Sequence, residues 1–169
     1  MSPLVLLALQ LSILAYALLG GVFLAFSDFI MRALGQTGGA GGVEAMQQIN
    51  REVFRWAFMT LFLGMAAVSA LVVLYSALTL SGAPGRLILL GGLVYLLGCF
   101  AVTVVFNVPM NEKLAAMSLS AEATLDYWTA TYLPRWTFWN TVRTLACAAA
   151  AALMLFGLFG LASPAPDRV

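Results

Sequence analysis

The sequence predicts an all-α integral membrane protein, built as a four-helix bundle with short amphipathic helices in its two long loops. Hydrophobic residues make up 63% of the 169 residues and charged residues only 9%, and the mean hydropathy is +0.98. Four apolar segments are each long enough, at about 1.5 Å per residue, to cross a hydrocarbon core of about 30 Å. We therefore expect a single transmembrane domain over residues 1–169, with spans at about 4–26, 58–80, 86–106 and 141–161.

Composition and charge also exclude several classes of function. The net charge of +1 offers no basic surface for nucleic acid, and the chain has no histidine, the common ligand for haem, iron, copper and zinc. Cys99 and Cys147 fall inside apolar segments, where a thiol behaves as a small apolar group, so we expect no disulfide. We predict no metal site and no cofactor. The expected partners are the lipid bilayer and a small hydrophobic ligand, with no nucleic acid, and homo-oligomer formation stays open.

The first span begins near the N-terminus and is expected to be a retained anchor. Its apolar run is longer than the core of a signal peptide, and no basic segment precedes it. Asp28 and Arg32 mark a boundary with water, and the run GQTGGAGG at residues 35–42 is expected to be a flexible hinge.

The first long loop carries a helical pattern at residues 43–56 (VEAMQQINREVFRW), which places Gln47 and Asn50 on neighbouring turns of one face. This segment is either a solvated connector helix or a helix whose amides form a half-buried cluster. After the second span, the turn SGAPG at residues 81–85 is short, so spans two and three should be antiparallel neighbours.

The third span ends in a polar segment that contains a proline. Pro109 lacks a backbone donor, so we expect the helix to kink or restart there, with Asn107 and Asn111 on either side of the break. These asparagines either line a cavity or simply cap a helix end. Residues 112–126 should then form a short amphipathic helix and begin another with Ser120 as N-cap. The tail SPAPDRV at 163–169 is too short to fold.

The stretch 127–144 (YWTATYLPRWTFWNTVRT) joins the second long loop to the last span and holds three of the four tryptophans. Trp136, Asn140 and Arg143 recur at i, i+4 and i+7, so they should share one helix face. This face is either a ligand site or part of an interfacial aromatic belt with Arg135 and Arg143 reaching the headgroups. The amide of Asn140 favours the site, because an amide near hydrocarbon needs polar partners.

Four spans place both long loops on the same side of the membrane. The Gln47 and Asn50 face, the asparagines around Pro109 and the Trp136, Asn140 and Arg143 face should therefore meet at one end of the bundle, where ligand sites between helices are expected. A buried guanidinium needs acceptors. For Arg143 we expect amide oxygens of Asn50 or Asn107 and carbonyls freed at Pro109.

Three motifs occur in order along the chain: MQQIN at 46–50, FNVPMNEKL at 106–114, and W, Y, RWTFWN and VRT between residues 128 and 144. Together they resemble the bacterial anthrone oxygenase-like membrane proteins over nearly the whole chain. The resemblance implies a four-helix membrane bundle that oxidises anthrones to anthraquinones without a metal or organic cofactor. The residues that match the polar positions of the family are Gln47, Asn50, Asn107, Asn111, Trp136, Asn140 and Arg143. We expect catalytic roles for Asn140, Arg143, Asn107 and Asn111, and substrate binding by Gln47, Asn50, Trp128, Tyr132 and Trp136, whose rings would stack on a planar substrate.

The chain departs from these relatives at Thr141, where many of them carry a histidine that would be a natural general base. Glu112, Asp126 and Tyr132 are the alternative bases. Counts of Lys and Arg alone favour long loops inside the cell. Relatives tend to carry basic residues near the place of Arg86, which implies instead that the short loop and both termini are cytoplasmic, in a bacterial inner membrane.

The sequence thus predicts a cofactor-independent membrane oxygenase for a planar hydrophobic anthrone- or quinone-like substrate. The alternatives are a membrane carrier for a lipid or quinone, and a structural subunit of a membrane assembly. Turnover of substrate under air separates the first from the second, and co-purifying proteins would favour the third.

Overall fold

The computed structural model describes residues 2–162, and all regular structure in this range is helical. The tail at 163–169, for which no fold was expected, lies outside the described residues. The elements in order, with η marking π-helical turns, are α1 (Pro3–Ala25), η1 (Phe26–Ile30), α2 (Met31–Gly35), α3 (Gly41–Glu52), α4 (Trp56–Thr79), α5 (Gly82–Val94), η2 (Tyr95–Ala101), η3 (Thr103–Asn107), α6 (Val108–Ala115), α7 (Glu122–Tyr127), η4 (Trp128–Tyr132) and α8 (Leu133–Ala162).

Several of these elements join into four continuous helices that are long and apolar enough to cross a membrane: Pro3–Gly35, Trp56–Thr79, Gly82–Ala115 and Glu122–Ala162. The predicted integral membrane four-helix fold is confirmed. The first, third and fourth helices are longer than the predicted spans, with 33, 34 and 41 residues. At about 1.5 Å per residue each of the three is longer than the roughly 30 Å of a hydrocarbon core.

The second long loop differs from the expectation. Its two polar helices are not separate, because α6 continues the third membrane helix and α7 leads through η4 into the fourth. The helix does not restart at Pro109, because the third membrane helix continues through this residue, which follows the π-helical turn η3. The next helix has Ala121 as its N-cap, one residue after the predicted Ser120.

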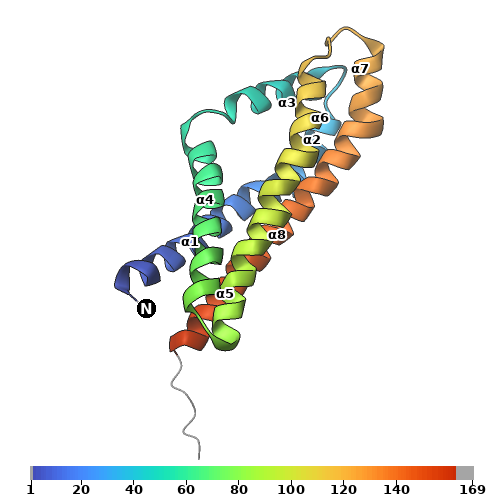
Figure 1. Cartoon of the computed structure of the whole chain (residues 1–169). Helices are drawn as coiled ribbons and strands as arrows, with labels where there is room; N and C mark the ends of the chain where they lie inside the picture. Colours follow the sequence, from blue (N-terminus) through green and yellow to red (C-terminus); the bar gives the residue numbers. More distant parts are fainter. Residues whose placement is uncertain (1, 163–169) are drawn as a thin grey trace, which may run out of the picture.

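Both long connections lie at the same end of the bundle, as predicted (Figure 1). That end, called the loop end below, carries α2, α3, α6 and α7, and the opposite end carries the start of α1, the α4 to α5 connection and the end of α8. In the first connection residues 36–40 and 53–55 lie outside helices, because α3 already begins at Gly41 and ends at Glu52. Gly42 is needed there, since a Cβ would lie 2.2 Å from the carbonyl oxygen of Leu34.

Helix α8 packs against α1 and α5, and α4 packs against α5 and α1. Small residues allow the close approach, as the alanine-rich sequence of the last span predicts. A Cβ on Gly98 would lie 2.7 Å from the Cβ of Ala146, and a Cβ on Gly20 would lie 3.1 Å from that of Cys147. The interior contacts of α8 therefore depend on small side chains from three helices.

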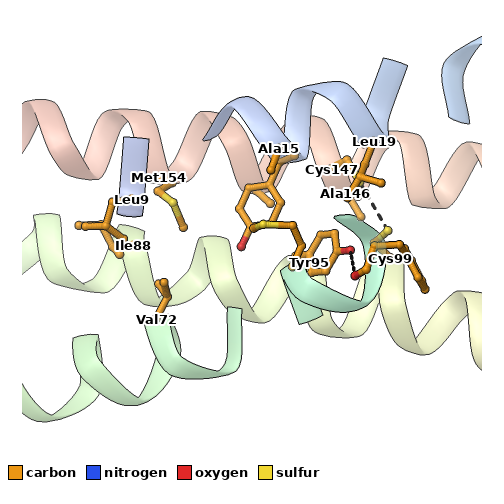
Figure 2. Packing of buried hydrophobic residues seen from close by; sticks show 14 of the residues in the cluster. Leu9, Ala15, Leu19, Val72, Ile88, Tyr95, Cys99, Ala146, Cys147 and Met154 are labelled. Carbon is orange, nitrogen blue, oxygen red and sulfur yellow. Dashed lines mark hydrogen bonds between the residues drawn. The ribbon is translucent and has the colours of Figure 1, made fainter. Parts of the chain in front are cut away.

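The buried residues fall into two clusters. The larger one fills the middle of the bundle, where Ile88, Tyr95 and Met154 are among its members (Figure 2). Tyr16 and Tyr95 stack in this cluster with ring centroids 4.9 Å apart. Their hydroxyls are satisfied by Ser69 Oγ at 2.7 Å and by the carbonyl of Phe62 at 2.9 Å. Cys99 and Cys147 are free thiols here, with sulfurs 3.5 Å apart.

The second cluster lies at the loop end and consists of Met31, Val43, Met46, Leu114, Trp128, Tyr132 and Trp136. All seven side chains are buried, and they come from α2, α3, α6, η4 and α8. This loop-end cluster packs the segments beyond the spans into a second core. The cavity described next lies between the two clusters, and side chains of both line it.

Candidate functional site

A cavity of about 230 Å³ lies between α1, α3, α4, η3 and α8. Most of its lining is aromatic or aliphatic, and the polar lining side chains fall into two groups. Arg143 lies with Asn140 and Thr103, and Asn50 and Asn111 share contacts with Tyr132, with the indole of Trp136 bonded to Asn111. A mostly apolar pocket with a few converging polar groups is typical of a small-molecule site.

The floor of the cavity is the predicted face of α8. Trp136, Asn140 and Arg143 all line it, and their exposed fractions are 5%, 0% and 5%. The sharing of one helix face is confirmed. The belt interpretation does not hold for Arg143, because its side chain is buried and does not reach the surface. Other aromatic residues are exposed instead, including Trp56 at 88% and Phe54 at 69%.

Arg143 is held by neighbours other than those expected. Its Nη2 donates to Oδ1 of Asn140 over 2.6 Å, and its Nη1 donates to Oγ1 of Thr103 over 3.2 Å. The expectation of Asn50, Asn107 and carbonyls at Pro109 is wrong. The nearer partners are available because Asn140 lies one turn earlier on α8 and Thr103 opens η3 beside it.

The guanidinium of Arg143 lies between two aromatic faces. Its Cζ is 4.3 Å from the ring centroid of Phe23 and 5.2 Å from that of Trp136. Cation–π contacts of this kind are stronger where water is excluded. These contacts lower the free-energy cost of burying the cation but supply no negative charge.

No carboxylate neutralises Arg143 within residues 2–162. The ion pairs in this part of the chain are Arg32 with Asp28 and Arg55 with Glu52, and all four side chains are exposed. A guanidinium offers five N–H donors, and Nε of Arg143 is buried without an acceptor. The cavity thus has a buried, incompletely paired cation in its wall, an unfavourable arrangement unless a ligand completes it.

Asn140 connects this cation to the first helix. Its Nδ2 donates to the carbonyl of Phe23 over 2.6 Å and to Oγ of Ser27 over 2.7 Å, while its Oδ1 accepts from Arg143. Ser27 also bonds to Thr141, the residue that stands where many relatives have histidine, with the two oxygens 3.0 Å apart. Thr141 is exposed and does not line the cavity.

A second polar group lies toward the loop end. Oδ1 of Asn111 accepts from the hydroxyl of Tyr132 over 2.7 Å and from Nε1 of Trp136 over 2.8 Å. Asn50 donates to the same hydroxyl over 3.3 Å. The rings of Trp128, Tyr132 and Trp136 stack in series, with centroids 5.3 and 6.2 Å apart. These contacts fix the positions of the Asn50 and Asn111 amides, which both line the cavity.

The structure separates the predicted site residues into two groups. Those that line the cavity are Asn50, Asn111, Trp136, Asn140 and Arg143, and those that do not are Gln47, Asn107, Trp128 and Tyr132. Gln47 is buried and donates to the carbonyls of Leu114 and Met117, which ties α3 to the end of α6. It is therefore not part of a solvated connector.

Asn107 is buried against α8, where its Nδ2 donates to the carbonyl of Trp136 over 3.3 Å. Its Oδ1 is buried without a partner among the described residues. Glu112 and Asp126, two of the predicted alternative bases, are exposed and outside the cavity wall. Neither carboxylate is placed to reach a ligand in this cavity.

Sequence reasoning missed two polar contributors, Ser27 and Thr103. Single hydroxyl residues inside apolar helices give little signal, because they usually bond to the carbonyl four residues earlier. Thr103 does make that bond, to Cys99 over 2.8 Å, and accepts from Arg143 as well.

A family model described as anthrone oxygenase matches residues 51–153. The chain belongs to the anthrone oxygenase family. The match covers more than half of the chain and includes Thr103, Asn111, Trp136, Asn140 and Arg143, whereas Ser27 and Asn50 precede it. Searches of curated proteins and of solved structures found no match. The family assignment agrees with the resemblance seen in the three sequence motifs and supports an oxygenase-type role.

Proposed function

We propose that the protein is a membrane oxygenase that binds a planar hydrophobic anthrone-like substrate in this cavity and oxidises it with dioxygen, without a cofactor. The observation that carries the proposal is the buried guanidinium of Arg143, which has unused donors and no carboxylate partner within residues 2–162. It lies at the polar end of an otherwise apolar cavity. Such an arrangement suits a ligand that is apolar over most of its surface and anionic at one oxygen.

An anthrone has this character. It contains a ketone in a fused three-ring system and a weakly acidic CH₂ group, and loss of a proton gives an enolate with charge on the oxygen. A nearby cation favours the ionised form, and donors fixed before the reaction stabilise the developing charge. Arg143 and Asn140 would hold the enolate oxygen, while Trp136, Phe58 and Phe62 contact the ring faces.

The reaction balances with dioxygen as the sole oxidant. The enolate passes one electron to dioxygen, and the resulting radical pair combines to form a carbon–oxygen bond at the former CH₂ carbon. The hydroperoxide then loses water and leaves a carbonyl group. One oxygen atom remains in the product, and the other leaves as water with the two hydrogens of the CH₂ group. The protein's part is to acidify the substrate, orient it and exclude bulk water.

The test uses purified protein in lipid nanodiscs with anthrone under air. We expect oxygen uptake and anthraquinone formation in a ratio of about 1:1, faster than in protein-free nanodiscs. Arg143→Lys keeps the charge but loses the planar fork, so kcat/KM should fall by about 100-fold, on the order of the loss of one oxyanion donor. Arg86→Lys is the control, because Arg86 is exposed near the opposite end.

Three results would overturn the proposal. Oxidation no faster than in protein-free nanodiscs would remove the enzymatic role, and saturable anthrone binding without turnover would favour the carrier. If Arg143→Lys retained the wild-type rate and melting temperature, the polar site would be wrong.

A further inference from the structure

Packed side chains cover part of the cavity at the loop end. The loop-end cluster lies beyond the cavity on that side, and Trp136 and Met46 belong to both the cluster and the cavity wall. From Trp136 the stack of rings continues through Tyr132 to Trp128, whose exposed fraction is only 4%. Gln47 holds α3 over this end by donating to two carbonyls of the opposite connection. Water and solutes therefore meet packed side chains over this part of the loop end.

The cavity is bordered on another side by exposed apolar residues. A side chain that lines the cavity and is also exposed marks its rim, and Val22, Phe54, Leu63 and Val104 meet both conditions, with exposed fractions of 41%, 69%, 51% and 51%. Val22, Leu63 and Val104 come from α1, α4 and η3, and Phe54 lies in the connection between α3 and α4. The charged lining residue, Arg143, lies on the buried floor. The mouth is therefore apolar and the polar group lies inside.

Helix lengths place the mouth toward the loop-end side of the lipid chains. Leu63 lies about 24 Å along α4 from its end at Thr79, and Val104 lies about 33 Å along its helix from Gly82, at about 1.5 Å per residue. A hydrocarbon core is about 30 Å thick, so Leu63 falls within this length and Val104 lies close to its limit. Trp56, at the start of α4, is 88% exposed, as an interfacial tryptophan would be. Leu63 is about 10 Å deeper.

The packing of α4 agrees with an opening between Leu63 of α4 and Val104 of η3. Its main contacts are with α5, α1 and η2, and its packing onto η3 is much sparser. The first turns of α4 therefore cover the cavity without packing closely against η3. The cavity of about 230 Å³ is smaller than the usual range of about 300–1,000 Å³ for ligand pockets. Its size selects against a whole phospholipid and in favour of a compact ring system.

We infer that the substrate enters this cavity sideways from the hydrocarbon layer, between Leu63 of α4 and Val104 of η3, as an uncharged ring compound. This inference rests on the proposed function. An apolar mouth admits the neutral ketone form and penalises an anion. The charged form arises only after the ligand lies beside Arg143. The substrate class is thus a neutral polycyclic compound that is dissolved in the membrane and loses a proton only inside the protein.

The test narrows the mouth with the double variant Leu63→Phe and Val104→Phe. The matched control is Leu71→Phe with Val105→Phe, which makes the same changes on the same two helices at residues that are 65% and 58% exposed and do not line the cavity. We expect kcat/KM for anthrone in nanodiscs to fall about tenfold in the mouth variant, with kcat changed by less than about twofold, because Arg143 is untouched. The control should match the wild type.

A second measurement does not need turnover. Anthraquinone association is followed by quenching of tryptophan fluorescence in nanodiscs, and it should be slowed about tenfold by the mouth variant alone. In vesicles, the association rate should depend on the ratio of ligand to lipid. It should not depend on the ligand concentration averaged over the whole sample volume. Equal rates in mouth and control variants, or a rate set by bulk concentration, would overturn the lateral route. Absence of turnover with slowed association would overturn only the proposed function.

Discussion

Asn140 and Arg143 lie one turn apart on α8, and the amide oxygen of the asparagine accepts a 2.6 Å hydrogen bond from the guanidinium. The same amide donates to the carbonyl of Phe23 on α1. The direction of the buried cation is therefore set by an amide that is itself anchored on a second helix. Residues 23 and 140 are far apart in sequence, so only the assembled bundle creates this arrangement.

Replacement of Asn140 by alanine should affect stability and activity together. It leaves one buried Arg143 donor without a partner and removes the link from α8 to the Phe23 carbonyl, which costs about 1–3 kcal/mol in the free energy of unfolding. We expect a lower melting temperature in detergent and a kcat/KM for anthrone reduced at least about tenfold. Gln48→Ala is the control, because this amide is exposed on α3. A lower melting temperature with an unchanged kcat/KM would show that Asn140 does not position Arg143 for the reaction.

A substitution at Thr103 tests whether the reaction needs Arg143 to have no carboxylate partner. Thr103→Asp places a carboxylate beside the Arg143 Nη1 that now bonds to the threonine hydroxyl. The new ion pair should keep the protein folded but neutralise the cation that the substrate anion requires. We expect kcat/KM to fall about 100-fold, whereas the uncharged Thr103→Asn should lose less than about tenfold. Similar kinetics for the two variants would argue that the charge of Arg143 is unimportant.

Tyr132 is the remaining sequence-predicted base, and its place behind the cavity wall predicts a structural role. Tyr132→Phe removes a donor to Asn111 and an acceptor for Asn50. The expected cost is about 1 kcal/mol in the free energy of unfolding, with kcat reduced less than about tenfold. Tyr75→Phe, on α4 near the opposite end, is the control. A 100-fold lower kcat at an unchanged melting temperature would instead indicate general base catalysis.

Membrane topology can be read by cysteine labelling in intact cells. Cys99 and Cys147 are fully buried and stay in place. Single cysteines at Gly38, Glu122 and Ser81 occupy exposed sites in the two long connections and the short one. We expect an impermeant reagent to label the first two from outside and Ser81→Cys only after lysis. Labelling of Gly38→Cys and Glu122→Cys from opposite sides would contradict the architecture, and labelling of Ser81→Cys from outside would reverse the orientation.

The fold and the α8 face that forms the floor of the site could be predicted from the sequence, because both depend on simple periodicities. Continuous apolar length predicted the four membrane helices, and the i, i+4, i+7 spacing placed Trp136, Asn140 and Arg143 on one buried face. The even number of spans predicted that Asn50 and Asn111 lie at the same end of the bundle. These inferences need only helix geometry and the thickness of a bilayer.

The partners within the site were not predictable in the same way. Asn107 and Gln47 look like ligand-binding amides in sequence, but both are used to satisfy backbone carbonyls of neighbouring segments. Thr103 became a partner of Arg143 through packing between distant helices. The role of a buried amide depends on which carbonyls lie opposite, and that is a property of the assembled bundle.

Three of the four membrane helices contain π-helical turns, at η1, at η2 and η3, and at η4. η2 lies near the middle of its helix, and η1, η3 and η4 lie nearer the loop end. Each such turn holds one more residue than an α-helical turn, and such turns are frequent at functional sites. Deleting one residue from η3 would restore α-helical winding and rotate Asn111 by about 100° around its helix axis relative to Cys99. The length of these segments is therefore under tighter constraint than the identity of most of their side chains. A single-residue deletion there would turn the cavity amides away while leaving the hydrophobic profile of the span almost unaltered.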